Sequence, residues 1–162
     1  MLFATFLGDN ITMSLNSVCI FDIDGTLANC DHRLHHVQNK PKNWEAFYSG
    51  CMDDQVIVPV AQMLKLFSKN NLIYILTGRP ERNRELTERW LEHHKISYNQ
   101  LIMRSDRDFR KSPDYKSAMC DSIERGGYKI NFVVEDRLDC VEMFIKRGLF
   151  CFDVSNGAFH DV

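Results

Sequence analysis

Long apolar runs and an excess of charge of either sign are both missing from this 162-residue sequence. No segment approaches the roughly 20 consecutive apolar residues that a transmembrane helix needs. The sequence holds 20 Lys and Arg against 22 Asp and Glu, a formal net charge of −2 at pH 7. This balance argues against a broad basic surface that coats nucleic acid, but it permits recognition of a single strand end or of a nucleotide.

Paired cysteines are missing too, because none of the six belongs to a C-x-x-C motif and several lie within apolar runs. Such spacings are not those of a zinc site or of a disulfide framework. We therefore predict reduced, buried cysteines in a cytoplasmic protein without a membrane partner. The six are Cys19, Cys30, Cys51, Cys120, Cys140 and Cys151.

The residues that are present suffice for one folded domain. A content of 44% hydrophobic and 26% charged residues is that of a globular chain. We expect residues 17–162 to form a single domain, because the ordered hydrophobic pattern begins near Ser17. Residues 1–16 start apolar, but they lack the basic flank of a signal peptide and are too short to span a bilayer. We expect them to be an N-terminal extension and a candidate for disorder.

Apolar runs alternate with amphipathic segments along the chain, and these predict strands and helices respectively. This alternation predicts an α/β fold, a doubly wound parallel sheet of about five strands with helices on both faces. The predicted strands span residues 17–23, 72–76, 100–103, 130–134 and 149–154. The predicted helices span residues 58–67, 81–94 and 114–125, and a last one follows Arg137 and ends at Lys146.

The connection between the first predicted strand and the first predicted helix is longer than a βα loop needs. Trp44, Phe47 and Tyr48 fall at i, i+3 and i+4, which places them on one face of a short helix. Two interpretations remain open. Either the aromatic residues pack on the body of the domain, or residues 28–55 form a small cap with an aromatic ring available to stack on a base.

The first predicted strand ends in a D-x-D-G-T motif. Asp22 and Asp24 would point to the same face of a regular strand, and the carboxyl end of a parallel strand borders the crevice where α/β sheets bind ligands. Gly25 lets the backbone turn, and Thr26 offers a hydroxyl and a backbone N–H to an anion. A turn that is merely acidic is the alternative, but the full motif behind an apolar strand favours a functional site.

Two further predicted strands also end in polar side chains. Thr77 and Gly78 follow the second strand and precede a predicted helix, where a hydroxyl and free N–H groups can bind phosphate. The adjacent acids Glu135 and Asp136 end the fourth strand. Because the carboxyl ends of parallel strands meet at one edge, four carboxylates would gather there, and a cation is the simplest way to tolerate them.

Together these stretches resemble the motifs of the haloacid dehalogenase (HAD) superfamily of aspartate-nucleophile phosphatases. Residues 21–27 resemble its motif I and residues 77–79 its motif II, while Lys116 lies where the superfamily places its motif III lysine. The sequence is most similar to the 3′-phosphatase domain of phage-type polynucleotide kinases. The similar stretches are residues 21–28, 77–79, 110–116, 135–144 and 152–159. No G-x-x-x-x-G-K-S/T stretch occurs, so we expect no P-loop kinase domain in this chain.

The resemblance implies a phosphomonoesterase with Mg²⁺ as cofactor and an aspartyl-phosphate intermediate. Asp22 would be the nucleophile and Asp24 the general acid and base. Lys116 would neutralise phosphate and nucleophile, and Thr77 would bind phosphoryl oxygens. The implied metal ligands are Asp22, the backbone carbonyl of Asp24, Asp136 and the nearby Glu135.

Substrate contacts fall to four other residues. A guanidinium near the site can hold a phosphate oxygen bidentately, which makes Arg33 and Arg79 candidates. Thr26 and Gly78 would bind the substrate through their N–H groups, and Thr26 also through its hydroxyl.

The sequence departs from the pattern of the kinase-phosphatases in two places. Motif IV is Glu135-Asp136 where those proteins have two aspartates, which leaves open which acid contacts the metal and whether Asp139 helps. Ser112 and Pro113 stand where an acidic pair precedes the motif III lysine, which weakens any transfer of substrate contacts there.

Three functions remain open on this basis. The leading one is removal of a 3′-phosphate from a nucleic-acid end, and the second is hydrolysis of a free nucleoside monophosphate. The third is a phospho-accepting signalling domain, a class that shares the doubly wound sheet and clustered acids. That class carries its phospho-acceptor on the third strand, whereas the candidate nucleophile Asp22 ends the first.

Overall fold

The computed structural model of this chain describes residues 16–155. The predicted extension before Asn16 lies outside these residues, and so does the end of the last similar stretch, residues 156–159. No helix within residues 16–155 is long and apolar enough to cross a membrane. All six cysteines are free, and five of them are buried.

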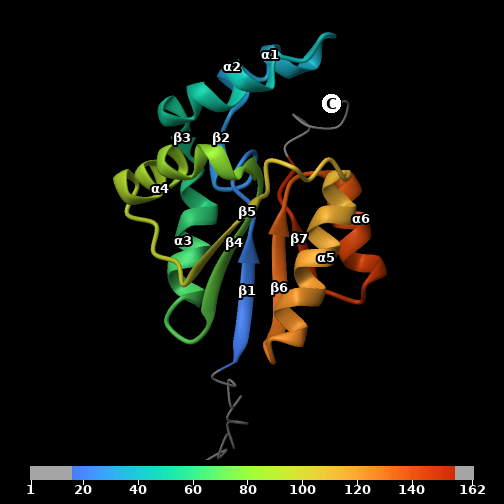
Figure 1. Cartoon of the computed structure of the whole chain (residues 1–162). Coiled ribbons are helices and arrows are strands. Elements are labelled where there is room, and N and C mark those ends of the chain that lie inside the picture. The colour runs from blue at the N-terminus through green and yellow to red at the C-terminus, as the bar shows by residue number, and fades with distance from the viewer. Residues whose placement is uncertain (1–15, 156–162) are drawn as a thin grey trace, which may run out of the picture.

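Five parallel strands form the sheet at the centre of the molecule, in the order β5-β4-β1-β6-β7 (Figure 1). The middle strand is β1 (Ser17–Phe21), between β4 (Leu72–Pro80) and β6 (Lys129–Glu135). The edges are β5 (Gln100–Arg104) and β7 (Cys151–Asp153). The prediction of a parallel sheet of about five strands is confirmed.

Four helices cover the two faces of this sheet (Figure 1). One pair is α3 (Val58–Phe67) and α4 (Arg84–His93), and the other pair is α5 (Ser112–Arg125) and α6 (Leu138–Lys146). Each pair has amphipathic helices whose apolar side chains close one of two separate hydrophobic cores.

Side chains of β1 divide between the two cores by strict alternation. Cys19 and Phe21 pack with side chains of α3 and α4, whereas Val18 and Ile20 pack with those of α5 and α6. A strand that is buried on both faces reads as a continuous apolar run. This explains why the central strand could be predicted so readily.

Strand β4 differs from its prediction, because it continues four residues beyond Leu76. Its register with β5 shifts after Leu76, and Pro80 then pairs with Arg104. Thr77, Gly78 and Arg79 therefore lie within an extended segment rather than in a turn before a helix. A short 3₁₀ turn, Glu81–Asn83, follows before α4 begins. This extension could not be predicted from the sequence, because Gly and Pro usually interrupt strands.

The insertion after β1 lies above the carboxyl ends of the strands (Figure 1). Two short antiparallel strands, β2 (Ala28–Asn29) and β3 (Gln55–Val56), pair at its base. Between them lie α1 (His35–Gln38) and α2 (Trp44–Ser49), preceded and followed by 3₁₀ turns. Its small core consists of Cys30, Leu34, Val37 and Phe47. The predicted cap is therefore present as a small structure with its own core.

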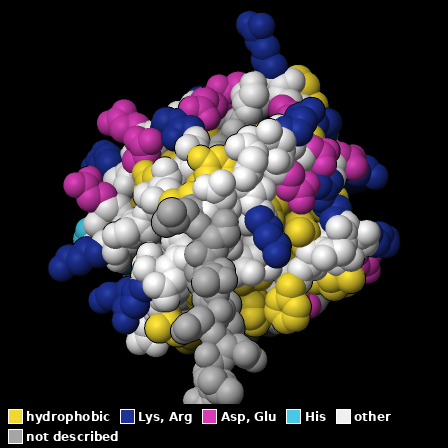
Figure 2. Space-filling model, turned by 90° about the horizontal axis from the view of Figure 1, so that it is seen from below, with side chains coloured by type: hydrophobic (Ala, Val, Ile, Leu, Met, Phe, Trp, Pro, Cys, Tyr) yellow, Lys and Arg dark blue, Asp and Glu magenta, His cyan; other side chains and the backbone are white. Residues whose placement is uncertain are grey.

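The opposite end of the molecule, where the strands begin, shows no separation of charge on its coloured part (Figure 2). Lys and Arg side chains stand there among Asp and Glu side chains. This mixture agrees with the net charge of −2.

Candidate active site

The turn after β1 brings two aspartates to the carboxyl edge of the sheet. The N–H of Asp22 donates to the Val134 carbonyl at 3.1 Å, so this residue is still held by β6. The chain then reverses at Gly25, whose φ of +88° lies in the left-handed region that glycine adopts without steric cost. The N–H of Gly25 donates to the Ala28 carbonyl at 2.8 Å and closes the turn.

Asp22 and Asp24 both line a pocket of about 670 Å³ at this edge. Thr77 and Gly78 from β4 and Lys116 from α5 line the same pocket. The structure thus brings together five of the residues that sequence analysis assigned to the site. Part of the lining comes from α2 of the insertion, and another part comes from residues 104–106 and 108–112, between β5 and α5.

Three carboxyl groups form a compact buried cluster beside the pocket. Ligand atoms of Asp22, Glu135 and Asp136 lie within 4.8 Å of one another. Oδ1 of Asp22 and Oδ2 of Asp136 are buried and accept no hydrogen bond. Burial and the neighbouring carboxylates raise the pKa of Asp22 to about 7 and that of Asp136 to about 9. Carboxylate oxygens that lie this close together and accept no hydrogen bond fit a hard divalent cation such as Mg²⁺. The cation would favour the ionised forms of these carboxyl groups.

Glu135 is engaged differently from Asp136. One of its oxygens accepts from Lys116 Nζ at 2.5 Å, and the other accepts the N–H groups of Asp136 at 3.3 Å and Arg137 at 3.2 Å. Because both oxygens already have donors, Asp136 is better placed than Glu135 to bind a metal directly. Asp139 pairs instead with Arg137 at 2.7 Å and is not part of the acidic cluster.

Lys116 lies between Glu135 and Asp22, with Nζ 3.0 Å from Asp22 Oδ1. The Asp22 contact is an ion pair without hydrogen-bond alignment, which leaves that oxygen available. Burial disfavours the ammonium form of Lys116, but Asp22 and Glu135 outweigh this and raise its pKa well above the ordinary value. The pocket floor therefore carries a fixed positive charge beside a carboxylate oxygen.

Thr77 is also suited to bind an anion. Its hydroxyl oxygen accepts the N–H of Arg79 at 3.2 Å, and the hydroxyl hydrogen has no acceptor among the described residues. It can therefore donate to a phosphoryl oxygen in the pocket.

Thr26 has a different role from the predicted one. Its hydroxyl donates to Asp136 Oδ1 at 2.9 Å, and its N–H donates to the Ile23 carbonyl at 3.1 Å. Both groups that were expected to bind substrate are thus occupied within the protein. Thr26 orients the side chain of Asp136.

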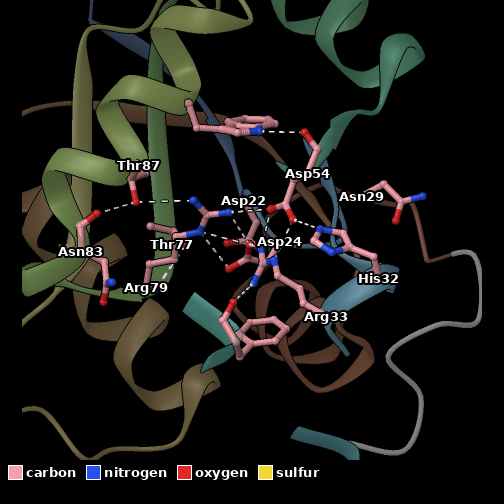
Figure 3. Close-up of polar contacts among 12 residues, drawn as sticks. Asp22, Asp24, Asn29, His32, Arg33, Asp54, Thr77, Arg79, Asn83 and Thr87 are labelled. Carbon is pink, nitrogen blue, oxygen red and sulfur yellow. Dashed lines mark hydrogen bonds and ion pairs between the residues drawn. The ribbon is translucent and has the colours of Figure 1, made fainter. Parts of the chain in front are cut away.

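Arg33 and Arg79, the other predicted substrate contacts, also have partners within the protein (Figure 3). Asp24 Oδ1 accepts from Nη2 of Arg33 at 2.6 Å and from Nη2 of Arg79 at 2.5 Å. Both guanidinium groups are buried and do not line the pocket. Burial opposes ionisation of Asp24, but the two guanidiniums outweigh it and lower the pKa of this carboxyl group.

Asp54 completes this network, and sequence analysis missed it. Its carboxylate accepts from Arg33 Nε at 2.7 Å, from Arg79 Nη2 at 3.2 Å and from His32 at 2.9 Å. Its backbone carbonyl accepts the indole N–H of Trp90 at 2.9 Å. We call Asp24, Arg33, Asp54 and Arg79 the ionic cluster. An acidic pair at the end of the insertion was the only signal in the sequence, and it gave no hint of these distant partners.

The geometry can now be compared with known proteins. The family model of the polynucleotide kinase PNKP phosphatase domain matches residues 16–159, almost the whole chain. The chain belongs to the PNKP phosphatase domain family. It is therefore a HAD-type phosphatase domain, as the resemblance of its motifs implied.

Two solved structures resemble this chain at the level of sequence as well as fold. A chain in the structure of the Pnkp1/Rnl/Hen1 RNA repair complex is 33% identical, with a TM-score of 0.76 over 90% of this chain and 44% of its own length. A chain from another structure of the Pnkp1/Rnl/Hen1 complex is 32% identical, with a TM-score of 0.73 over 89% of this chain and 47% of its own. The chain thus spans less than half the length of each of these relatives.

A more distant match supports the fold alone. CbbY from Rhodobacter sphaeroides, solved in complex with phosphate, is 14% identical, with a TM-score of 0.62 over 92% of this chain and 90% of its own. The chain shares its α/β fold with this structure.

Proposed function

We propose that this domain is a Mg²⁺-dependent phosphomonoesterase that removes the 3′-phosphate from nucleic-acid ends. The observation that carries the proposal is Asp22, which presents an oxygen to the pocket beside Lys116 and next to the acidic cluster. The family match and the relatives found in RNA repair complexes support a nucleic-acid end as the substrate.

Asp22 is the nucleophile in this proposal. One of its carboxylate oxygens forms a bond to phosphorus while the bond from phosphorus to the 3′ oxygen breaks. Water then attacks the same phosphorus, which releases inorganic phosphate and restores the carboxylate of Asp22. Lys116 and Thr77 hold the phosphoryl oxygens during both steps, because both line the pocket beside Asp22.

Asp24 moves the protons in both steps. It donates a proton to the leaving 3′ oxygen and later takes one from the attacking water. In the free protein the guanidiniums of Arg33 and Arg79 keep its pKa low. A phosphate that enters the pocket brings negative charge close to Asp24, which favours the protonated form that the first step requires.

Asp22 and Asp136 are the side chains that would hold Mg²⁺, with the backbone carbonyl of Asp24 as the third predicted protein ligand. When bound, the ion offsets the repulsion between an anionic nucleophile and an anionic phosphate. Glu135 orients Lys116, and Thr26 orients Asp136. Each residue of the cluster thus has a separate task.

Phosphate release with and without Mg²⁺ tests the proposal. The substrates are oligonucleotides with a 3′-phosphate, the same oligonucleotides with a 5′-phosphate, and nucleoside monophosphates. We expect Mg²⁺-dependent release from the 3′-phosphate alone and none from Asp22→Asn. Full activity after treatment with EDTA would remove the metal from the proposal, and retained activity of Asp22→Asn would remove the nucleophile.

The same assay separates the other two functions. Preferred hydrolysis of nucleoside monophosphates would identify a nucleotidase. A phosphorylated protein that persists without turnover would identify a phospho-accepting domain.

A further inference from the structure

The insertion presents an aromatic surface to the pocket that the proposed chemistry does not use. Trp44 and Tyr48 of α2 both line the pocket, and their rings stack at a centroid distance of 5.8 Å and an angle of 22°. Phe47 lies beneath them in the core of the insertion, whereas Trp44 is 39% exposed. An exposed indole held against a second ring offers a flat face to a ligand in the pocket.

Another exposed aromatic side chain lines the pocket from outside the insertion. Phe109, in the segment that connects β5 to α5, is 91% exposed and lines the pocket. The backbone around it is fixed by Asp108, whose N–H donates to the Ser105 carbonyl at 2.9 Å. Exposing a whole phenyl ring to water is unfavourable in free energy. A ligand that stacks on the ring would remove its apolar surface from water.

Two lysines without an ion-pair partner among residues 16–155 line the pocket together with these rings. Lys42 lies 5.6 Å from the centroid of the Trp44 ring, and Lys111 adjoins the loop of Phe109. Neither lysine forms an ion pair with any described residue. The negative charges of Asp106 and Asp108 in the same region are already neutralised, because these side chains pair with Arg82 and Arg110 respectively. The net charge that remains available at the mouth of the pocket is therefore positive.

We propose that this rim, made of Trp44, Tyr48 and Phe109 with Lys42 and Lys111, binds the nucleotides that precede the 3′-terminal phosphate of a single strand. The inference rests on the proposed phosphatase function and specifies its substrate further. Aromatic faces stack on any base, and cations follow the backbone phosphates, which is how proteins bind single strands without reading their sequence. Bases in a duplex are already stacked and paired, so the rim selects an unpaired 3′ end.

Binding is tested apart from catalysis with the Asp22→Asn protein. The sequence has two tryptophans, and Trp90 is buried, so quenching of tryptophan fluorescence reports on Trp44. A single-stranded octanucleotide with a 3′-phosphate should quench this fluorescence to saturation. The same end in a blunt duplex should bind at least about tenfold more weakly, since one base–aromatic stack alone contributes about that factor.

A second substitution, Phe109→Ala, should raise the dissociation constant of the single strand by about tenfold. The matched control is Phe150→Ala, because Phe150 is also strongly exposed (63%) but does not line the pocket. It should leave the dissociation constant unchanged. Equal affinity for single strand and duplex, or a Phe109→Ala protein that binds like its parent, would overturn the inference.

Turnover distinguishes this inference from the proposed function. With the active protein, kcat/KM should rise from a nucleoside 3′-phosphate to a dinucleotide and an octanucleotide, and Phe109→Ala should reduce that rise. Equal kcat/KM at all lengths would overturn the rim and leave the 3′-phosphatase in place. If no substrate releases phosphate, the proposed function fails, and the fluorescence titration still decides whether the rim binds a single strand.

Discussion

Two buried guanidiniums contact the proposed proton donor Asp24, and the buried carboxylate of Asp54 contacts both of them. Asp24 and Asp54 each contact both Arg33 and Arg79, so the two negative and two positive charges of the ionic cluster balance. Removal of one partner from such a group leaves a buried charge without compensation. The position of the Asp24 carboxylate is therefore set by two guanidiniums that do not line the pocket.

Asp24→Asn should separate the chemistry of proton transfer from this structural role. We expect kcat to fall by about 10²–10⁴-fold on a 3′-phosphorylated oligonucleotide, whose leaving oxygen needs a proton. The loss should be much smaller on p-nitrophenyl phosphate, because nitrophenolate leaves without one. The measurement is kcat for both esters.

Asp54→Asn is the matched control, because it disturbs the same ionic cluster without removing the proton donor. Its loss should be similar on the two esters. If Asp24→Asn also loses activity equally on both, Asp24 is a positioning residue and not the acid.

The raised pKa values of Asp22 and Asp136 predict how metal binding depends on pH. Unfolding returns both carboxyl groups to the ordinary acidic range, so the metal-free folded state binds more protons up to about pH 9. Its free energy of unfolding should therefore fall as the pH rises through this range. Mg²⁺ requires the ionised carboxylates, and its affinity should rise over the same range.

The measurement is the melting temperature with and without Mg²⁺. The increase caused by Mg²⁺ should be larger at about pH 8 than at about pH 6. Asp136→Asn should abolish most of it. An increase that is the same at both values would contradict the assignment of these carboxylates.

At the scale of elements, what could be predicted follows from the parallel sheet. Strand carboxyl ends must meet at one edge, so Asp22, Thr77 and Asp136 could be placed together from sequence alone. The extension of β4 and the roles of Arg33 and Arg79 could not be predicted. They depend on a register shift and on Asp54, whose partners lie 21 and 25 residues away along the chain. No local pattern encodes a contact between an insertion and a strand.

The insertion is expected to open as a unit of its own, because its core is separate from the two cores of the sheet. Phe47→Ala removes the largest side chain of that core and one face of a contact with Arg33, whose guanidinium carbon lies 4.1 Å from the ring centroid. Amide exchange should become faster in residues 31–53 and stay unchanged in β1 and β6.

Hydrogen exchange followed by mass spectrometry measures this opening. Leu66→Ala, at an exposed position of α3, is the control and should alter neither region. Faster exchange throughout the sheet after Phe47→Ala would mean that the insertion and the sheet unfold together.

At the scale of the whole molecule, the near balance of charge limits how nucleic acid can bind. Both signs are interspersed on the end opposite the pocket (Figure 2), so attraction to a strand has to come from the few free cations of the rim. Two of them, on a single strand, predict that the logarithm of the affinity falls against the logarithm of the salt concentration with a slope of about −1.4.

Titrations of the octanucleotide at several salt concentrations measure this slope. Lys111→Ala should reduce its magnitude by somewhat less than one. Lys129→Ala, at an exposed position where β6 begins, is the control and should leave it unchanged. A slope several times steeper would point to a much longer contact with the backbone than the rim offers.

The contacts of Asp54 have one further consequence, for how a substrate enters. Asp54 belongs to the insertion. It joins the insertion to β4 through Arg79 and to α4 through the indole of Trp90. A rigid-body movement of the insertion away from the sheet would separate the buried charges of Asp54 and Arg79, which is costly because water does not reach them. We therefore expect the entrance to keep a constant width as long as the insertion stays folded, so that in the proposed function the thickness of a nucleic-acid end decides whether it can enter.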